Sequence, residues 1–116
     1  MVVQVDDVRR LAMSLPGTTE HLIRDRVKFR VKQLVYVSFS RDETLMGFGY
    51  PKDIRADLVA ARPDTFQMPV ASDLRYNWVV ARLDALDRAD MVELVTDAWT
   101  MVVPKYVARD YFAQSP

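Results

Sequence analysis

The sequence predicts an α+β fold in which helices pack on one side of a small antiparallel sheet. Hydrophobic residues recur at helical spacing near both ends of the chain and alternate with polar residues in its middle. The connections between the alternating segments are too short for crossover helices, so neighbouring strands should run antiparallel. Because the strands are grouped, the predicted order is helix, three strands, helix, strand, helix (α-β-β-β-α-β-α).

The first predicted element is a helix over residues 5–15. Val8 and Leu15 belong to an apolar stripe at helical spacing, and Asp6 can cap the first turn. The dipeptide that begins at Pro16 ends the helix, because proline cannot continue the hydrogen-bond ladder.

The middle of the chain predicts a three-stranded meander. Residues 18–25 are expected to form a polar loop, and residues 26–32 alternate strictly between basic and apolar side chains. Alternation over this length is typical of a half-buried strand. Segments 34–40 and 44–50 follow as the second and third strands. The basic side chains of the first strand are Arg26, Lys28, Arg30 and Lys32.

A helix and a fourth strand are predicted next. Pro51 suits the first position of a helix that closes before Pro63. Residues 63–75 are expected to be irregular, and residues 76–83 to form a buried strand. The predicted buried stripe of this helix consists of Ile54, Leu58 and Ala61.

The chain is predicted to end in a long helix capped by Asp87, with an apolar face at a period of 3.6 residues. Pro104 ends or kinks it, and residues 105–112 can add one or two further turns. Gly47 and Gly49 alternate on the third strand, where they are expected to relieve crowding beneath a helix or a large side chain.

Length and composition favour one domain spanning residues 1–116. Half of the residues are hydrophobic, which is enough to build a core. The chain has no cysteine, as is common in the reducing cytosol, and the first ten residues do not resemble a signal peptide. No apolar stretch approaches the roughly 20 residues that span a bilayer. We therefore expect a cytoplasmic protein with no membrane partner.

Charge is unevenly distributed, although 16 basic and 16 acidic side chains cancel overall. Residues 24–41 hold six cations and one acid, for a net charge of +5, and the rest of the chain has ten cations and fifteen acids, for −5. Such local patches, more than the total, steer a charged partner.

The residues suggest neither a catalytic site nor a metal site, so the chain is not expected to be an enzyme and no cofactor is predicted. His21 is the only histidine, and no cysteine is present. A serine–histidine site would need Glu20 or Asp25 to orient His21 and a serine from a distant part of the chain, and no serine lies in a nucleophile elbow. The same loop residues have no spacing that defines metal coordination.

The basic strand over residues 26–32 is the feature that suggests a function. Alternate residues of a strand are about 7 Å apart, so a row of cations can follow the phosphates of a nucleic acid. The alternative is an edge strand whose cations face water and prevent aggregation. Four further cations can assist DNA binding: Arg41, Arg75, Arg82 and Lys105.

Aromatic residues leave a second interpretation open. Tyr36, Phe66, Tyr76 and Trp78 can stack on bases, although each fits a core or its rim as well. A pocket near Phe66 and Trp78 would instead suit a protein-interaction or small-ligand adaptor that binds no nucleic acid.

Four motifs in order resemble the MmcQ/YjbR-like family of small bacterial proteins. They are VDDVRRLAMSLPGTTE at the start, the basic K-F-R-V strand, Tyr76 to Val80 with its tryptophan, and the ending from Asp97 to Lys105. The similarity extends over roughly residues 4–108. The chain differs from the family just before Trp78. Family members often have a lysine or arginine together with a histidine there, whereas this chain has Arg75-Tyr76-Asn77.

This resemblance implies an α+β fold that has been likened to the double-wing DNA-binding motif, and it supplies no catalytic residues. A DNA-binding role inferred in this way is an analogy from fold.

Overall fold

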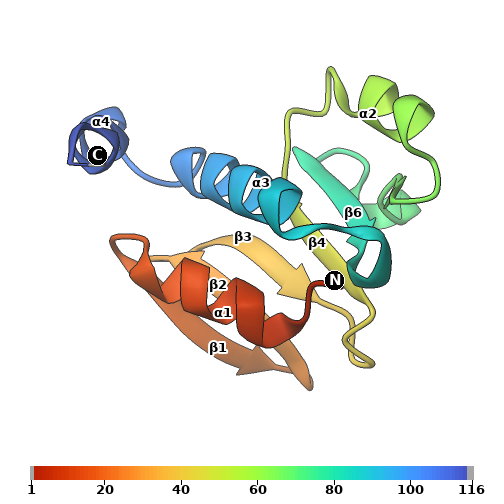
Figure 1. Ribbon diagram of the computed structural model, residues 1–116, viewed down its shortest axis with the longest axis horizontal. Helices are drawn as coiled ribbons and strands as arrows, with labels where there is room; N and C mark the ends of the chain where they lie inside the picture. Colours follow the sequence, from red (N-terminus) through yellow and green to blue (C-terminus); the bar gives the residue numbers. More distant parts are fainter. Residues whose placement is uncertain (1, 115–116) are drawn as a thin grey trace.

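The computed structural model describes residues 2–114 and contains a six-stranded antiparallel sheet in the order β1-β2-β3-β4-β6-β5 (Figure 1). The predicted α+β class is confirmed. The strands are β1 (Thr18–Ile23), β2 (Arg26–Val31), β3 (Leu34–Phe39), β4 (Leu45–Gly49), β5 (Phe66–Gln67) and β6 (Trp78–Arg82). The helices are α1 (Val5–Ser14), α2 (Arg55–Ala61), α3 (Arg88–Thr100) and α4 (Lys105–Ala113), with 3-10 turns η1 (Ala71–Asp73) and η2 (Leu83–Ala85).

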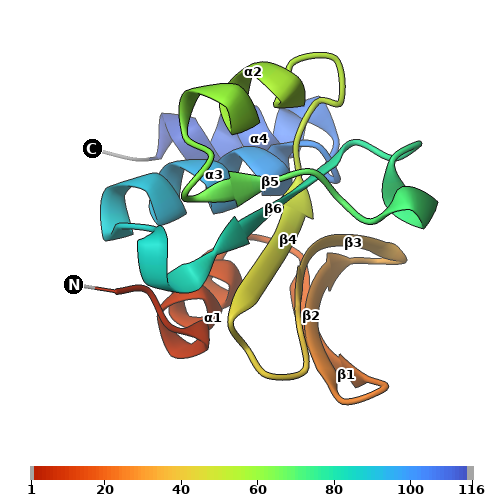
Figure 2. The same cartoon turned by 90° about the vertical axis from the view of Figure 1, so that its right-hand side faces the viewer.

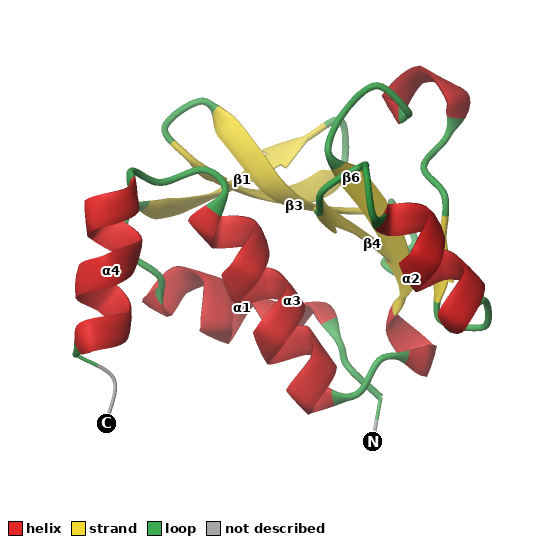
Figure 3. Ribbon diagram, turned by 90° about the horizontal axis from the view of Figure 1, so that it is seen from above, coloured by secondary structure: helices red, strands yellow, loops and turns green. Residues whose placement is uncertain are grey.

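Helices α1 and α3 pack side by side on one face of the sheet (Figures 1 and 3). Helix α1 contacts β1, and α3 contacts β3 and β4. The indole N–H of Trp99 donates a 2.9 Å hydrogen bond to the carbonyl oxygen of Pro16, which joins α3 to the turn after α1. Trp99 is fully buried, and its ring also meets that of Tyr111 from α4 edge to face.

One row of cross-strand neighbours forms the floor of the core beneath these helices. Phe29, Val37, Phe48 and Val79 lie opposite one another on β2, β3, β4 and β6, and all four are fully buried. Directly paired residues of antiparallel strands share a face of the sheet. The face that carries this row is called the helix face below, and the opposite one the open face.

Strand β1 corrects the prediction of a polar loop over residues 18–25. It pairs with β2 along its whole length, from Thr18 to Ile23. Only Thr18 is buried, so this edge strand has no alternation of apolar and polar residues. The hairpin turn places Arg24 and Asp25 at positive φ without the glycine or asparagine that marks such turns in a sequence.

Strand β2 is an interior strand, because β1 and β3 pair with its two sides. Its cations therefore do not protect a sheet edge, and that explanation of the basic row is wrong. The predicted alternation is confirmed: Val27, Phe29 and Val31 are buried and the intervening residues are exposed or partly exposed.

The segment before β6 differs from the prediction in two ways. Helix α2 begins at Arg55 instead of Pro51, and its buried residue is Arg55. Of the predicted apolar stripe, Leu58 is partly buried and packs against the core, whereas Ile54 is 48% exposed and Ala61 is exposed. The stretch predicted to be irregular contains β5 and η1. Farther on, the Asp87 side chain accepts a hydrogen bond from the Asp90 amide, which confirms the predicted cap of α3. None of the helices within residues 2–114 has the length and apolar character needed to cross a membrane.

Candidate functional site

A groove with a volume of about 680 Å³ runs across the open face of the sheet. Its floor is a second row of cross-strand neighbours, one residue away from the buried row on each strand. In strand order this row is Lys28, Ser38, Gly47, Val80 and Gln67. Because successive residues of a strand point to opposite faces, burial of the first row exposes the second.

The two walls of the groove differ in chemistry. Arg26 and Lys28 of β2 line one side. The other side is formed by β6 and the segment that precedes it, residues 68–77, which includes η1, and the C-terminal end of α3 also lines the groove with Ala98, Met101 and Val102. Figure 2 shows this segment projecting beyond β6, on the side toward which β3 curves. Three of its apolar side chains are well exposed: Met68 at 41%, Val70 at 67% and Tyr76 at 51%.

Trp78 lies against the strand backbone at Gly47. A Cβ atom at Gly47 would stand 2.5 Å from the indole Nε1 and 2.9 Å from two carbons of the ring. At Gly49 the same atom would meet Ala98 and Met101 of α3 at 3.5–3.7 Å. The expectation that a glycine relieves crowding is confirmed at Gly47, beneath a large side chain, whereas a Cβ atom at Gly49 would make only ordinary van der Waals contacts with α3. The indole of Trp78 is only partly buried and lines the groove.

Arg55 holds the aromatic wall in place. Its guanidinium donates hydrogen bonds to the carbonyl oxygens of Leu74, Tyr76 and Trp78, at 2.5, 2.8 and 3.1 Å. The Arg55 side chain is buried, and its Nε is left without a partner. One buried cation thus satisfies three alternate carbonyls, two in the irregular segment before β6 and one at the first residue of β6.

A second set of hydrogen bonds joins the same wall to the turn before α2. The Lys52 amide donates to Asn77 Oδ1 at 3.0 Å, and Lys52 Nζ donates to the Arg75 carbonyl at 3.2 Å. The Tyr50 amide donates to the Asn77 carbonyl at 3.1 Å. These contacts and the Arg55 bonds support the wall from behind, so its position does not depend on a ligand.

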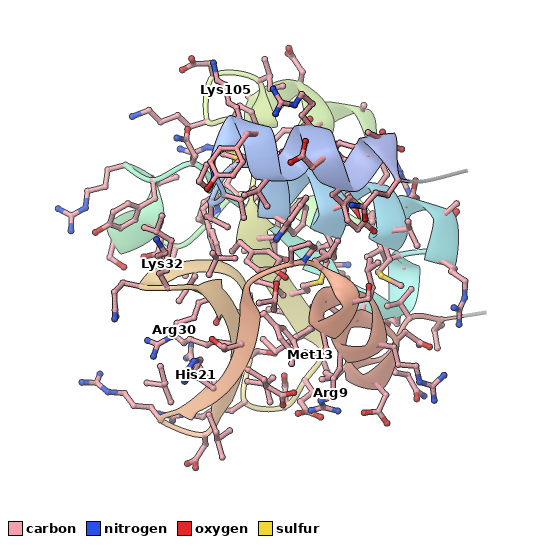
Figure 4. The ribbon with its side chains drawn as sticks, turned by 90° about the vertical axis from the view of Figure 1, so that its left-hand side faces the viewer. Arg9, Met13, His21, Arg30, Lys32 and Lys105 are labelled. Atoms are coloured by element: carbon pink, nitrogen blue, oxygen red, sulfur yellow. The ribbon has the colours of Figure 1, made fainter. Side chains whose placement is uncertain are left out.

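The cations of β2 project from the open face, and no acid among residues 2–114 forms an ion pair with them. Arg26 and Lys28 line the groove, and Arg30 lies beyond it with its Nε buried and unpaired. In Figure 4 His21, Arg30 and Lys32 lie on one side of the β1–β2 hairpin, and Arg9 of α1 lies on the other. Within residues 2–114, the ion pairs involve other arginines: Arg9, Arg62, Arg88 and Arg109.

The remaining predicted DNA contacts are more scattered. Lys32 lies in the β2–β3 turn, and the Arg41 side chain donates a hydrogen bond to the Arg24 carbonyl in the neighbouring hairpin turn. Arg82 follows Val80 by two positions on β6 and therefore shares the open face. The Arg75 guanidinium stacks on the Tyr76 ring, 4.9 Å from its centroid. Lys105 begins α4 and lies apart from Arg30 and Lys32 (Figure 4).

Of the aromatic residues considered for stacking, two reach the surface and two do not. Tyr36 is fully buried and its hydroxyl hydrogen-bonds to that of Thr18 at 2.8 Å. Phe66 is 1% exposed and packs edge to face against Phe48 in the core. Phe66 therefore belongs to the core and does not line the groove. Trp78, the other predicted pocket residue, does line the groove, together with Tyr76.

His21 and Glu20 point to opposite faces of β1. Glu20 binds the Arg9 guanidinium, with Arg9 Nε 2.9 Å from its Oε1, and this hydrogen bond raises the pKa of Arg9. His21 Nε2 lies 2.9 Å from Thr19 Oγ1. Glu20 is therefore not available to orient His21. No cluster of three or more histidine and carboxylate side chains suited to a metal occurs among the residues described.

Sequence reasoning identified the basic wall of the groove and Trp78, and it missed how the opposite wall is built. The 68–77 segment has no regular pattern, and Arg55 stands among charged residues at the start of a helix, where burial is not expected. The irregular composition of residues 63–75, with two prolines, was the only sequence signal of a loop with a distinct role.

Comparison with solved structures shows the same fold in another protein. The crystal structure of the Deinococcus radiodurans protein DR2400, which has a DUF419 domain, superposes with a TM-score of 0.78 over 94% of this chain and 88% of that one. The two sequences are 19% identical. None of the curated proteins gives a significant match. The YjbR family model matches residues 13–101, which contain all six strands of the sheet and the whole of α3, and the chain therefore belongs to the YjbR family.

Proposed function

We propose that this chain is a non-enzymatic DNA-binding protein that contacts phosphates through the basic strand β2. The observation that carries the proposal is the row formed by Arg26, Lys28 and Arg30 on an open sheet face. These three cations have no ion-pair partner among the residues described, although four other arginines do. Cations left without a partner on one face are available to an external polyanion.

The position of β2 strengthens this interpretation. Because β2 is an interior strand, its cations are not needed to block edge-to-edge aggregation. Lys32 and Arg41, in the turns at the two ends of the β2–β3 pair, can extend the row. Asp42, in the turn after β3, is engaged elsewhere, because it accepts hydrogen bonds from Ser40 and Thr44, which lower its pKa.

Fluorescence-anisotropy titration of labelled DNA at several salt concentrations tests the proposal. Binding should weaken steeply as salt rises, because phosphate contacts release condensed counterions. In Arg26→Gln/Lys28→Gln the slope of log K against log salt should fall by about 1.4–1.8, for two contacts at 0.7 each on single strands or 0.9 each on duplex.

The matched control removes the same charge elsewhere. Arg10 lies on α1 and Arg109 on α4, and both are exposed. Arg10→Gln/Arg109→Gln should keep the salt slope of the unaltered protein. Equal losses in the two double variants would mean that only net charge matters, and absence of binding at low salt would refute the DNA-binding function.

The apolar wall of the groove favours a second candidate, an adaptor that binds a small ligand or a protein segment. Val70 is 67% exposed on that wall and Met68 41%, and the groove lies within the range of about 300–1,000 Å³ typical of ligand pockets. Such binding would depend little on salt. Ligand screening monitored by Trp78 emission distinguishes it from the first candidate.

A further inference from the structure

We infer that the groove binds unpaired bases of a single nucleic-acid strand, with Trp78 as the stacking surface and Arg26 and Lys28 on the phosphates. This inference rests on the proposed function and adds to it the form of the nucleic acid. It follows from the size of the groove, the setting of Trp78, the support behind the aromatic wall and the distribution of charge.

The size of the groove suits bases and excludes a duplex. Its volume of about 680 Å³ is that of a small-molecule pocket. A duplex keeps the faces of its bases stacked inside, so it has no free base face to place on Trp78. An unpaired strand can place its bases against the Trp78 ring, over the part of the groove floor formed by Ser38 and Val80.

Trp78 is set as a platform. Its indole lies on the backbone of Gly47, where no side chain separates the ring from the strand. Tyr76, two residues earlier, is 51% exposed on the same wall, and the Arg75 guanidinium covers one side of its ring. Aromatic side chains beside a cationic track are the usual means of holding single strands, since every base has a face that can stack.

The platform is preorganised. Arg55 fixes the carbonyls of Leu74, Tyr76 and Trp78, and Lys52 fixes Asn77 between them. A wall already held in its bound position loses little conformational freedom when a ligand arrives, which favours affinity.

The charged residues of the groove determine on which side the phosphates of the strand lie. Arg26 and Lys28 line the β2 side, and Asp73 of η1 lines the opposite side. Phosphates are attracted to β2 and repelled from η1, while the exposed apolar surface on the η1 side faces the bases. The phosphate of a nucleotide therefore meets the basic wall, and its base meets the apolar wall.

Intrinsic fluorescence gives a direct test, because the chain has two tryptophans and only Trp78 is accessible. Trp99 is fully buried with its N–H bonded to Pro16. The probes are a short oligothymidylate, an abasic oligonucleotide of the same length, and a duplex. We expect the oligothymidylate to bind most tightly and quench the emission, and the quenching to disappear in Trp78→Phe.

Affinity for oligothymidylate should fall about 5- to 150-fold in Trp78→Leu, since a base stacked on an aromatic ring contributes roughly 1–3 kcal/mol. Tyr106→Leu is the matched control, because Tyr106 is a similarly exposed aromatic residue on α4. Thermal unfolding of both variants establishes that they are folded.

The probes separate this inference from the proposed function. Equal binding of abasic and base-containing strands, with unchanged emission, would overturn base binding in the groove and leave the phosphate surface standing. Tighter binding of the duplex than of the oligothymidylate would also overturn base binding in the groove and leave the phosphate surface standing. If no probe binds at low salt, both proposals fail.

Discussion

The two faces of the sheet use the same strands for different purposes. On the helix face, Phe29, Val37, Phe48 and Val79 form a fully buried row beneath α1 and α3. One residue away on each strand, the open face has a cation, a serine, a glycine and a valine, and ends at Gln67. Stability should therefore depend on the first row and binding on the second.

The reason for the difference is the number of layers. A face covered by helices must be apolar, because a buried polar group without a partner costs free energy. The open face is covered only at Gly49, which the C-terminal end of α3 approaches, so the cations of β2 remain hydrated and an aromatic ring can lie against the backbone of Gly47. The comparison predicts a descending series of effects on the free energy of unfolding.

The largest effect is expected from Phe48→Ala on the helix face. Phe48 is fully buried and meets Tyr50 and Phe66 edge to face. Its truncation should cost about 3–5 kcal/mol, from lost burial and the cavity left behind. Urea denaturation measures this loss. Val80→Ala, on the open face of β6, is the control, and a comparable cost there would remove the distinction between the faces.

Arg55→Met should have the next largest effect, because Arg55 is a buried residue whose hydrogen bonds hold a wall of the groove on the open face. The variant leaves the carbonyls of Leu74, Tyr76 and Trp78 without their donor, at a cost of about 1–3 kcal/mol. It should also weaken oligonucleotide binding by loosening the aromatic wall.

The control for this variant is Arg62→Met at the other end of α2. Arg62 forms a half-exposed ion pair with Asp90 at 2.8 Å, and such pairs contribute about 0–1 kcal/mol. Denaturation and anisotropy titration are run on both variants. If Arg55→Met binds DNA with unchanged affinity, Arg55 does not position the wall.

Tyr36→Phe should cost about 0.5–1.5 kcal/mol near neutral pH, through loss of the hydrogen bond to Thr18. Burial raises the pKa of Tyr36 to about 12, with the Thr18 bond opposing the shift. The unfolded chain ionises this phenol near pH 10, so its stabilising effect is complete below pH 10 and is lost as the pH rises to about 12.

The measurement for Tyr36 is the free energy of unfolding as a function of pH. The difference between the unaltered protein and Tyr36→Phe should be constant below pH 10 and should shrink above it. A difference that stays constant up to pH 12 would contradict the burial of an un-ionised phenol.

The smallest effect on stability is expected from Arg26→Gln/Lys28→Gln. Neither residue forms an ion pair among the residues described, and substitutions at such surface positions usually change stability by less than about 0.5 kcal/mol. Denaturation of the variant used for DNA titration checks this. A loss well above that value would identify these cations as structural.

Sequence periodicity located those elements in which one side is buried. Helices α1 and α3 show the 3.6-residue repeat, and β2 shows strict alternation, because each places one face against the core. Strand β1 was missed for the same reason: at the edge, only Thr18 is buried, and no pattern remains to be recognised.

The sequence by itself determined the α+β class, the family resemblance, the basic strand and the glycine, Gly47, that makes room for a large side chain. Only the tertiary structure decided that β2 is interior, that Phe66 is core while Trp78 lines a groove, and that Arg55 is buried. These outcomes depend on the strand order β4-β6-β5, which brings residues 67–78 opposite residues 26–28. Local sequence encodes which face of an element is apolar, whereas the neighbour that faces it is set by long-range pairing.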